Sequence, residues 1–102
     1  MQVLGSHTYK VDDEVRTLSW GTGGDGSAHV LERSEGSLTE SLFGCPAREV
    51  ELAFTPSGAY GLDDVERTVE LSGEGCFASD LEDELTQLGI PFTREVRSLQ
   101  AA

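Results

Sequence analysis

Residues 48–55 read REVELAFT, a run in which apolar side chains alternate with polar or small ones. Val50, Leu52 and Phe54 fall on one side of the run, and two glutamates and an alanine fall on the other. Alternation with a period of two is typical of a β-strand that buries one face. The run therefore predicts a strand that contributes three large side chains to the core of a sheet.

Two more alternating runs precede this strand, and a glycine-rich segment separates them. Residues 15–20 and 28–33 both carry β-favouring side chains, and residues 21–27 between them read GTGGDGS. Two strands around a short glycine-rich loop predict a β-hairpin. Shorter β-favouring runs near the N-terminus predict two brief strands, at residues 2–4 and 8–11.

The clearest helix signal lies in the C-terminal half of the chain. Ser79 and Glu82 have the spacing of a capping box, and leucines at helical spacing follow them. Gly89 and Pro91 predict the end of this helix. Residues 92–99 then predict a last strand.

Two other segments are less regular. Residues 34–44 predict a loop that can carry one helical turn. Residues 65–72 fit a strand with inward Val65, Val69 and Leu71, whereas a helix that begins at Leu62 fits the two valines nearly as well. We favour the strand and keep the helix as the alternative.

The length of 102 residues is that of one domain. The predicted elements place the chain in the α+β class, as a single compact domain over residues 1–102. Its expected architecture is a mainly antiparallel sheet of about five or six short strands, with the helix of the C-terminal half packed on it.

The chain is strongly acidic, with 7 Lys and Arg against 19 Asp and Glu and a net charge of −12. Nucleic acid is excluded as a natural partner, because phosphate contacts need clustered Lys and Arg. No apolar run is long enough for a membrane span or a signal-peptide core, so we expect a cytoplasmic protein. The charge favours a basic protein as the partner.

Cysteine and histidine are too sparse to indicate a metal site or a disulfide framework. Cys45 and Cys76 lack CxxC spacing, and we expect two reduced thiols, with a bridge between them as the alternative. His7 and His29 have no further ligands at short spacing. No GxSxG elbow is present, so we predict neither catalytic residues nor a cofactor.

The glycine-rich loop matches a nucleotide-binding pattern only in its spacing. Gly21, Gly23 and Gly26 satisfy GxGxxG. A dinucleotide site needs a helix directly after these glycines, and here a strand-like run follows. We predict a plain hairpin loop. The alternative is a small enzyme or ligand-binding domain that uses the loop as an anion or nucleotide cradle.

One acid-rich segment stands out as a candidate partner-binding surface. Its members are Tyr60, Asp63, Asp64, Glu66 and Glu70. In the strand interpretation, Glu66 and Glu70 share the solvent face, and Tyr60 is an exposed aromatic anchor beside them. A rim of carboxylates around one aromatic side chain would steer and hold a basic partner.

Three stretches in the middle of the chain carry a family resemblance. They are DGSAHVLERS at residues 25–34, the segment from Gly44 to Phe54, and SGAYG at residues 57–61 with the Val-Glu and Val-Glu-Leu groups after it. Residues 15–72 thereby resemble the tenth family of immunity proteins from bacterial polymorphic-toxin systems. The resemblance implies a small non-enzymatic inhibitor that binds and blocks a secreted toxin in the producing cell. It transfers no catalytic residue.

Overall fold

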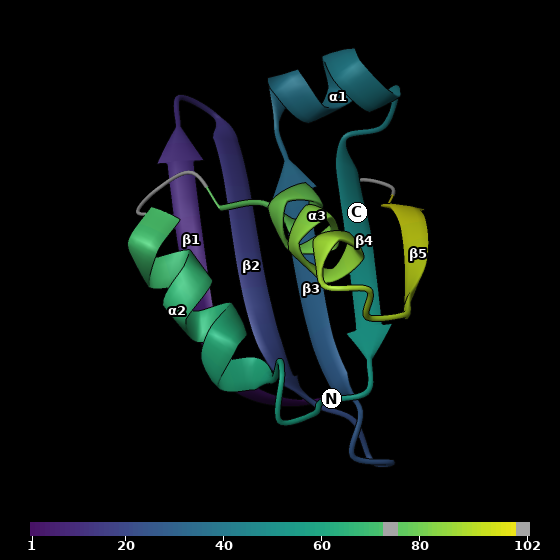
Figure 1. Cartoon of the computed structure of the whole chain (residues 1–102). Coiled ribbons are helices and arrows are strands. Elements are labelled where there is room, and N and C mark those ends of the chain that lie inside the picture. The colour runs from purple at the N-terminus through teal and green to yellow at the C-terminus, as the bar shows by residue number, and fades with distance from the viewer. Residues whose placement is uncertain (73–75, 100–102) are drawn as a thin grey trace.

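A computed structural model describes residues 1–72 and 76–99 of the chain (Figure 1). Eight elements follow one another: β1 (Gln2–Val11), β2 (Glu14–Thr22), β3 (Ala28–Glu35), α1 (Ser37–Phe43), β4 (Ala47–Phe54), α2 (Leu62–Ser72), α3 (Ala78–Gln87) and β5 (Phe92–Leu99). The five strands form one sheet in the order β1-β2-β3-β4-β5, and all neighbours are antiparallel. The predicted α+β class with an antiparallel sheet is confirmed.

Two layers make up the molecule (Figure 1). Helices α2 and α3 lie on one face of the sheet, and α1 lies at the end where β3 passes into β4. Strand alternation directs the large apolar side chains of β2, β3 and β4 toward α2 and α3, where they form the core. Its largest fully buried apolar members are Leu52, Leu81, Leu85, Val30 and Val65. The core face predicted for residues 48–55 is confirmed.

The first strand is one continuous element. The prediction of two brief strands at 2–4 and 8–11 is wrong, because β1 pairs with β2 along its whole length. Its register shifts once, between Val3 and Gly5. Ladder hydrogen bonds with β2 override the weak strand propensity of the polar residues between the two runs. Similarly, the helical turn expected within residues 34–44 is the seven-residue helix α1.

The strand prediction for residues 65–72 is also wrong, since this segment is helix α2. Val65 and Val69, four residues apart, are 1% and 4% exposed, whereas Leu71 is 82% exposed. Four-residue spacing brings both valines to the same side of a helix, which packs them on the sheet. The Asp64 carboxylate accepts a hydrogen bond of 2.7 Å from the Gly61 N–H and satisfies one donor at the helix start.

Helix α3 begins slightly before its predicted cap. Residue Phe77 occupies the N-cap, and Asp80, not Ser79, closes the first turn by accepting from the Phe77 N–H at 2.8 Å. The helix ends near Gly89, whose φ of 71° lies in the left-handed region. The predicted stop is therefore correct.

Two further predictions concern the state of the cysteines and the absence of a membrane span. Cys45 is partly exposed and Cys76 is buried, and both carry free thiols as predicted. Burial is the main cause that raises the pKa of the Cys76 thiol. Within residues 1–72 and 76–99, no helix has the length and apolar character that crossing a membrane requires.

Candidate functional site

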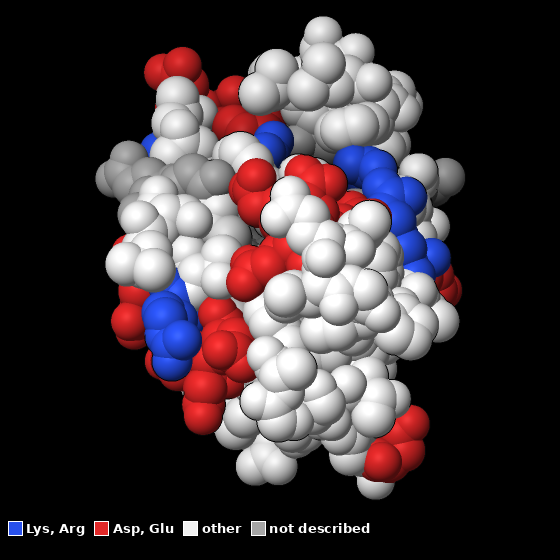
Figure 2. All heavy atoms as spheres, viewed as in Figure 1, with Lys and Arg blue, Asp and Glu red and all other residues white. Residues whose placement is uncertain are grey.

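The predicted acidic segment lies on helix α2 and the turn before it. Asp63, Glu66 and Glu70 are all exposed, and their spacing of three and four residues places them on one side of the helix. We call these three residues the α2 acidic face. Figure 2 shows acidic side chains over α2 and between α2 and α3, together with basic atoms over α2, where Arg67 lies, and a stripe of basic side chains between α3 and β5.

The other two predicted site residues have structural contacts. Asp64 accepts from the Gly61 N–H and lies 3.6 Å from Nη1 of Arg67, so its charge is partly neutralised. Tyr60 is 2% exposed, and its ring centroid lies 5.6 Å from that of Phe54. Burial, with the nearby Glu84 carboxylate, raises the pKa of the Tyr60 hydroxyl. The prediction of an exposed aromatic anchor is wrong, because the turn before α2 folds Tyr60 into the core.

A cavity of about 420 Å³ opens beside the α2 acidic face, between α2 and the edge strand β1. Gly5 and Trp20 line it from the sheet, and Glu66 and Glu70 line it from the helix. His7 of β1 lines it as well. The cavity thus joins two of the five predicted site residues to Gly5, Trp20 and His7, which were not predicted to belong to the site.

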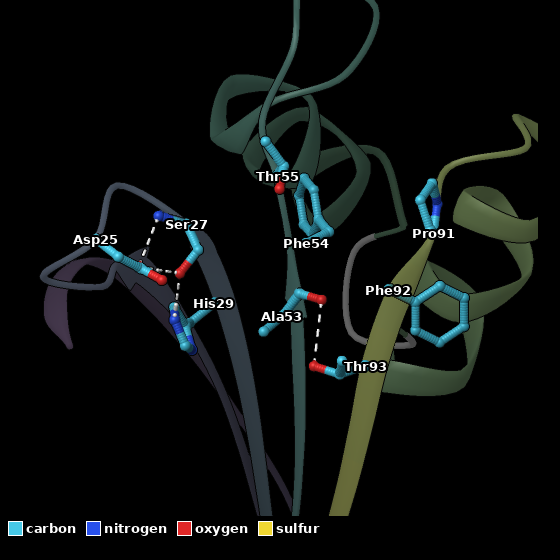
Figure 3. A pocket seen from close by; sticks show the side chains of 9 residues that line it. All are labelled: Asp25, Ser27, His29, Ala53, Phe54, Thr55, Pro91, Phe92 and Thr93. Carbon is cyan, nitrogen blue, oxygen red and sulfur yellow. Dashed lines mark hydrogen bonds between the residues drawn. The ribbon is translucent and has the colours of Figure 1, made fainter.

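A second pocket, of about 400 Å³, lies where the β2–β3 loop approaches β5 (Figure 3). Asp25, Ser27 and His29 form one wall, and Pro91 and Phe92 form the opposite wall. The first wall begins a chain of hydrogen bonds that continues across the helix-free face of the sheet.

This chain is continuous from the loop to β5. Ser27 Oγ lies 2.6 Å from Asp25 Oδ1 and 2.8 Å from His29 Nε2. On the other side of the ring, His29 Nδ1 lies 2.9 Å from Glu51 Oε2. Arg97 then donates through Nη2 to Glu51 Oε1 at 3.0 Å. Four strands or loops are tied together by one polar network.

The order serine, histidine, glutamate is also that of a hydrolase triad. However, the hydroxyl of Ser27 has a single proton. Its nearer neighbour is the Asp25 carboxyl, whose pKa is held below its ordinary value by hydrogen bonds from Ser27. An ionised carboxylate can only accept hydrogen bonds. Ser27 therefore donates its proton to Asp25, so this proton is not directed at His29 Nε2. A serine activated by histidine requires the opposite direction of donation.

The loop itself uses its backbone donors internally. Gly23 donates to the Ser27 carbonyl at 2.8 Å, and Gly26 donates to the Gly23 carbonyl at 3.1 Å. The Ser27 N–H donates to Asp25 Oδ1 at 3.0 Å. Three N–H groups that could cradle an anion or an oxyanion already have partners. This geometry favours a structural role for the loop over the alternative of an anion cradle.

The polar network predicts a loss of stability in acid. The hydrogen bond from His29, and then the Arg97 guanidinium, hold the pKa of the Glu51 carboxyl below its ordinary value of 4.5. A lowered folded-state pKa gives stability that is present above the unfolded pKa and lost as pH falls through the folded value. We expect the free energy of unfolding, measured by urea denaturation, to fall between about pH 5 and pH 2.

The Glu51→Gln variant tests this cause. It should cost about 1 kcal/mol at pH 7 and show a flatter dependence on pH than the parent protein. The exposed Glu40→Gln variant on α1 is the matched control and should keep the parent slope. Equal slopes in all three proteins would show that Glu51 is not responsible.

Metal binding has no support in the described parts of the chain. Over residues 1–72 and 76–99, no group of three or more His, Cys, Asp or Glu side chains could hold a metal ion.

Comparisons of the chain with family models, curated proteins and solved structures found no match. The sequence had indicated the α2 acidic face but missed the cavity beside it. Sequence spacing contains no sign of that cavity, since Gly5 and Trp20 meet only through the register of β1 on β2. Ser27 lies directly before β3 and His29 is its second residue, so their spacing of two could have indicated that they are neighbours.

Proposed function

We propose that this protein is a non-enzymatic acidic binding protein, and more specifically an immunity protein that neutralises a cognate bacterial toxin by direct binding. It acts in the cytoplasm of the producing cell, and its partner is a basic protein surface. The observation that supports this proposal best is the α2 acidic face, which presents three carboxylates on one rigid element.

The charges of this face are available to a partner. Asp63, Glu66 and Glu70 form no ion pair with any residue in the described ranges. Their helix is fixed by Val65 and Val69, which are buried against the sheet. Preorganised carboxylates accelerate association with a basic surface, and they reject acidic partners.

The function is tested by protection. A toxin gene beside the gene for this protein is expected, and co-expression of the two should preserve the growth of cells that the toxin alone would kill. A purified toxin domain should form a complex with this protein. Absence of both protection and binding would refute the proposal.

The charge-reversed variant D63K/E66K/E70K tests the surface. We expect its association rate with the toxin to fall about 10- to 100-fold at low salt, with a weaker salt dependence, because electrostatic steering is lost. Stopped-flow measurements over a range of ionic strength give both quantities. Asp64 is left unchanged, since its contact with Gly61 holds the start of α2.

The matched control is E35K/E40K/E95K, which changes net charge equally on exposed residues of β3, α1 and β5. It should slow association only about two- to three-fold. If both variants slow association to the same extent, net charge steers the partner and the α2 acidic face is not the binding surface.

A further inference from the structure

One end of the molecule presents exposed apolar side chains. Leu38 and Leu42 are 49% and 61% exposed, and their spacing of four residues places them on one side of α1. Val11, at the end of β1, is 47% exposed. A cavity of about 570 Å³ is lined by Val11, Leu38 and the half-buried rings of Tyr9 and Phe77. We call Val11, Leu38 and Leu42 the α1 apolar patch.

Helix α1 is fixed to the sheet, so it presents these side chains in a defined arrangement. Thr39 is fully buried, and both its N–H and its hydroxyl donate to the Glu14 carboxylate. At the first turn of α1, the N–H and the hydroxyl of Ser37 donate to Asp13. Exposed apolar groups that are grouped on a preorganised surface are typical of a protein interface.

The border of the patch is acidic on the side of the β1–β2 turn. Asp12 and Asp13 are exposed and line the cavity, and neither forms an ion pair within residues 1–72 and 76–99. Hydrogen bonds from Ser37 hold the pKa of Asp13 below its ordinary value, so this carboxyl is ionised at neutral pH. Arg16 also lines the cavity, but its guanidinium lies 3.7 Å from Glu14. In Figure 2 the surface over α1 is white, and acidic side chains lie beside it over the β1–β2 turn.

We infer that the α1 apolar patch anchors an amphipathic segment of the basic protein partner. Large apolar side chains of that segment enter the cavity, and its Lys or Arg side chains contact Asp12 and Asp13. A few well-packed side chains supply most of the affinity of an interface, whereas exposed charges mainly govern the association rate. The inference rests on the proposed function, and it supplies the anchor that the buried Tyr60 does not provide.

Charge favours this occupant over a second copy of the chain. Each copy carries a net charge of −12, and a two-fold contact through the patch would bring Asp12 and Asp13 of one copy near those of the other. A basic segment meets the same two carboxylates with the opposite charge.

The variant L38S/L42S tests the anchor in the complex with the toxin. We expect its dissociation rate to rise at least about tenfold, because apolar contacts are lost. Its association rate should stay within about two-fold of the parent value, because the steering charges remain. This result differs from that of D63K/E66K/E70K, which changes the association rate. Surface plasmon resonance measures both rates.

The matched control is L88S/V96S, which alters two side chains that are 54% and 41% exposed near the end of α3 and on β5. It should dissociate within about two-fold of the parent rate. Far-UV circular dichroism checks that both variants keep their helices. Equal dissociation rates of L38S/L42S and L88S/V96S would overturn the inference.

A peptide titration tests the patch without the toxin. The probe is a fluorescein-labelled amphipathic peptide of lysine and leucine, and its counterpart has glutamate in place of every lysine. We expect saturable binding of the lysine peptide by fluorescence anisotropy, at least about five-fold weaker for L38S/L42S than for L88S/V96S. The glutamate peptide should show no saturable binding. Equal binding of both peptides, or equal binding by both variants, would overturn the inference.

Asp12→Asn tests the charged border with the same lysine peptide. Asn tolerates the left-handed backbone of position 12, where φ is 55°. We expect binding to weaken about two- to three-fold at low salt and to approach the parent value at high salt. An unchanged affinity at low salt would contradict the assigned contact with Asp12.

The failure of this inference differs from the failure of the proposed function. Protection and toxin binding that L38S/L42S leaves unchanged would place the anchor elsewhere and keep the function intact. Patch-dependent peptide binding without toxin binding or protection would refute the toxin partner and keep the docking surface. Size-exclusion chromatography with light scattering examines the remaining occupant. A dimer that L38S/L42S abolishes would assign the patch to a second copy and overturn the inference.

Discussion

Replacing Leu81 by alanine is expected to lower the free energy of unfolding by about 2–5 kcal/mol. Leu81 is 1% exposed on α3, and it belongs to the core cluster that joins both helices to the sheet. Truncation removes buried methyl and methylene groups, and the close-packed neighbours refill the space only in part. Urea denaturation followed by circular dichroism measures the change.

Leu88 is the matched control for this substitution. The sequence places it in the same leucine stripe, but the structure leaves it 54% exposed just after α3. Leu88→Ala should therefore change stability by less than about 0.5 kcal/mol. Similar losses for the two alanine variants would mean that α3 does not pack as described.

The second large effect is expected for Glu32→Ala, at about 2–3 kcal/mol of destabilisation. Glu32 is 9% exposed, and its Oε2 accepts a hydrogen bond of 2.5 Å from the N–H of Ala78 at the start of α3. The carboxylate also complements the positive end of the helix dipole. Truncation leaves a buried donor without a partner and removes a charge that the helix end favours.

Glu32→Gln separates these two contributions. The amide oxygen still accepts the hydrogen bond from Ala78, so this variant should lose only the interaction between the charge and the helix dipole. We expect its free energy of unfolding to fall by about 1 kcal/mol. Both values come from thermal or urea unfolding. If Glu32→Ala is no more destabilising than Glu32→Gln, the contact with Ala78 does not hold α3 to β3.

The sheet could be predicted because alternation reports burial directly. Residues 48–55 have one apolar and one polar side, and only a strand with one buried face satisfies that pattern. Residues 65–72 do not have this clarity. Two valines that are four residues apart fit a helix by their spacing and a strand by their side-chain type. Burial of both valines against the sheet stabilises the helix.

Part of the candidate site could also be predicted, because residue spacing groups its acidic side chains. The spacing of Asp63, Glu66 and Glu70 keeps them together on a helix, although the prediction assumed a strand. The aromatic anchor was misplaced, since the sequence does not reveal that Tyr60 packs against Phe54 in the core. Contacts between residues that are distant along the chain depend on the tertiary fold, which local spacing does not specify.

The strand order has a consequence for how the chain reaches this fold. Each of the first four strands pairs with its neighbour across a short connection, whereas residues 55–91 separate the paired ends of β4 and β5. Loop closure costs about 0.6 kcal/mol more for every doubling of loop length, so this last pairing carries the largest entropic penalty of the sheet. On a ribosome, β5 also emerges after every other element. The β4 edge therefore stays open longest during synthesis, and it is the edge at which a nascent chain is most exposed to pairing with another chain.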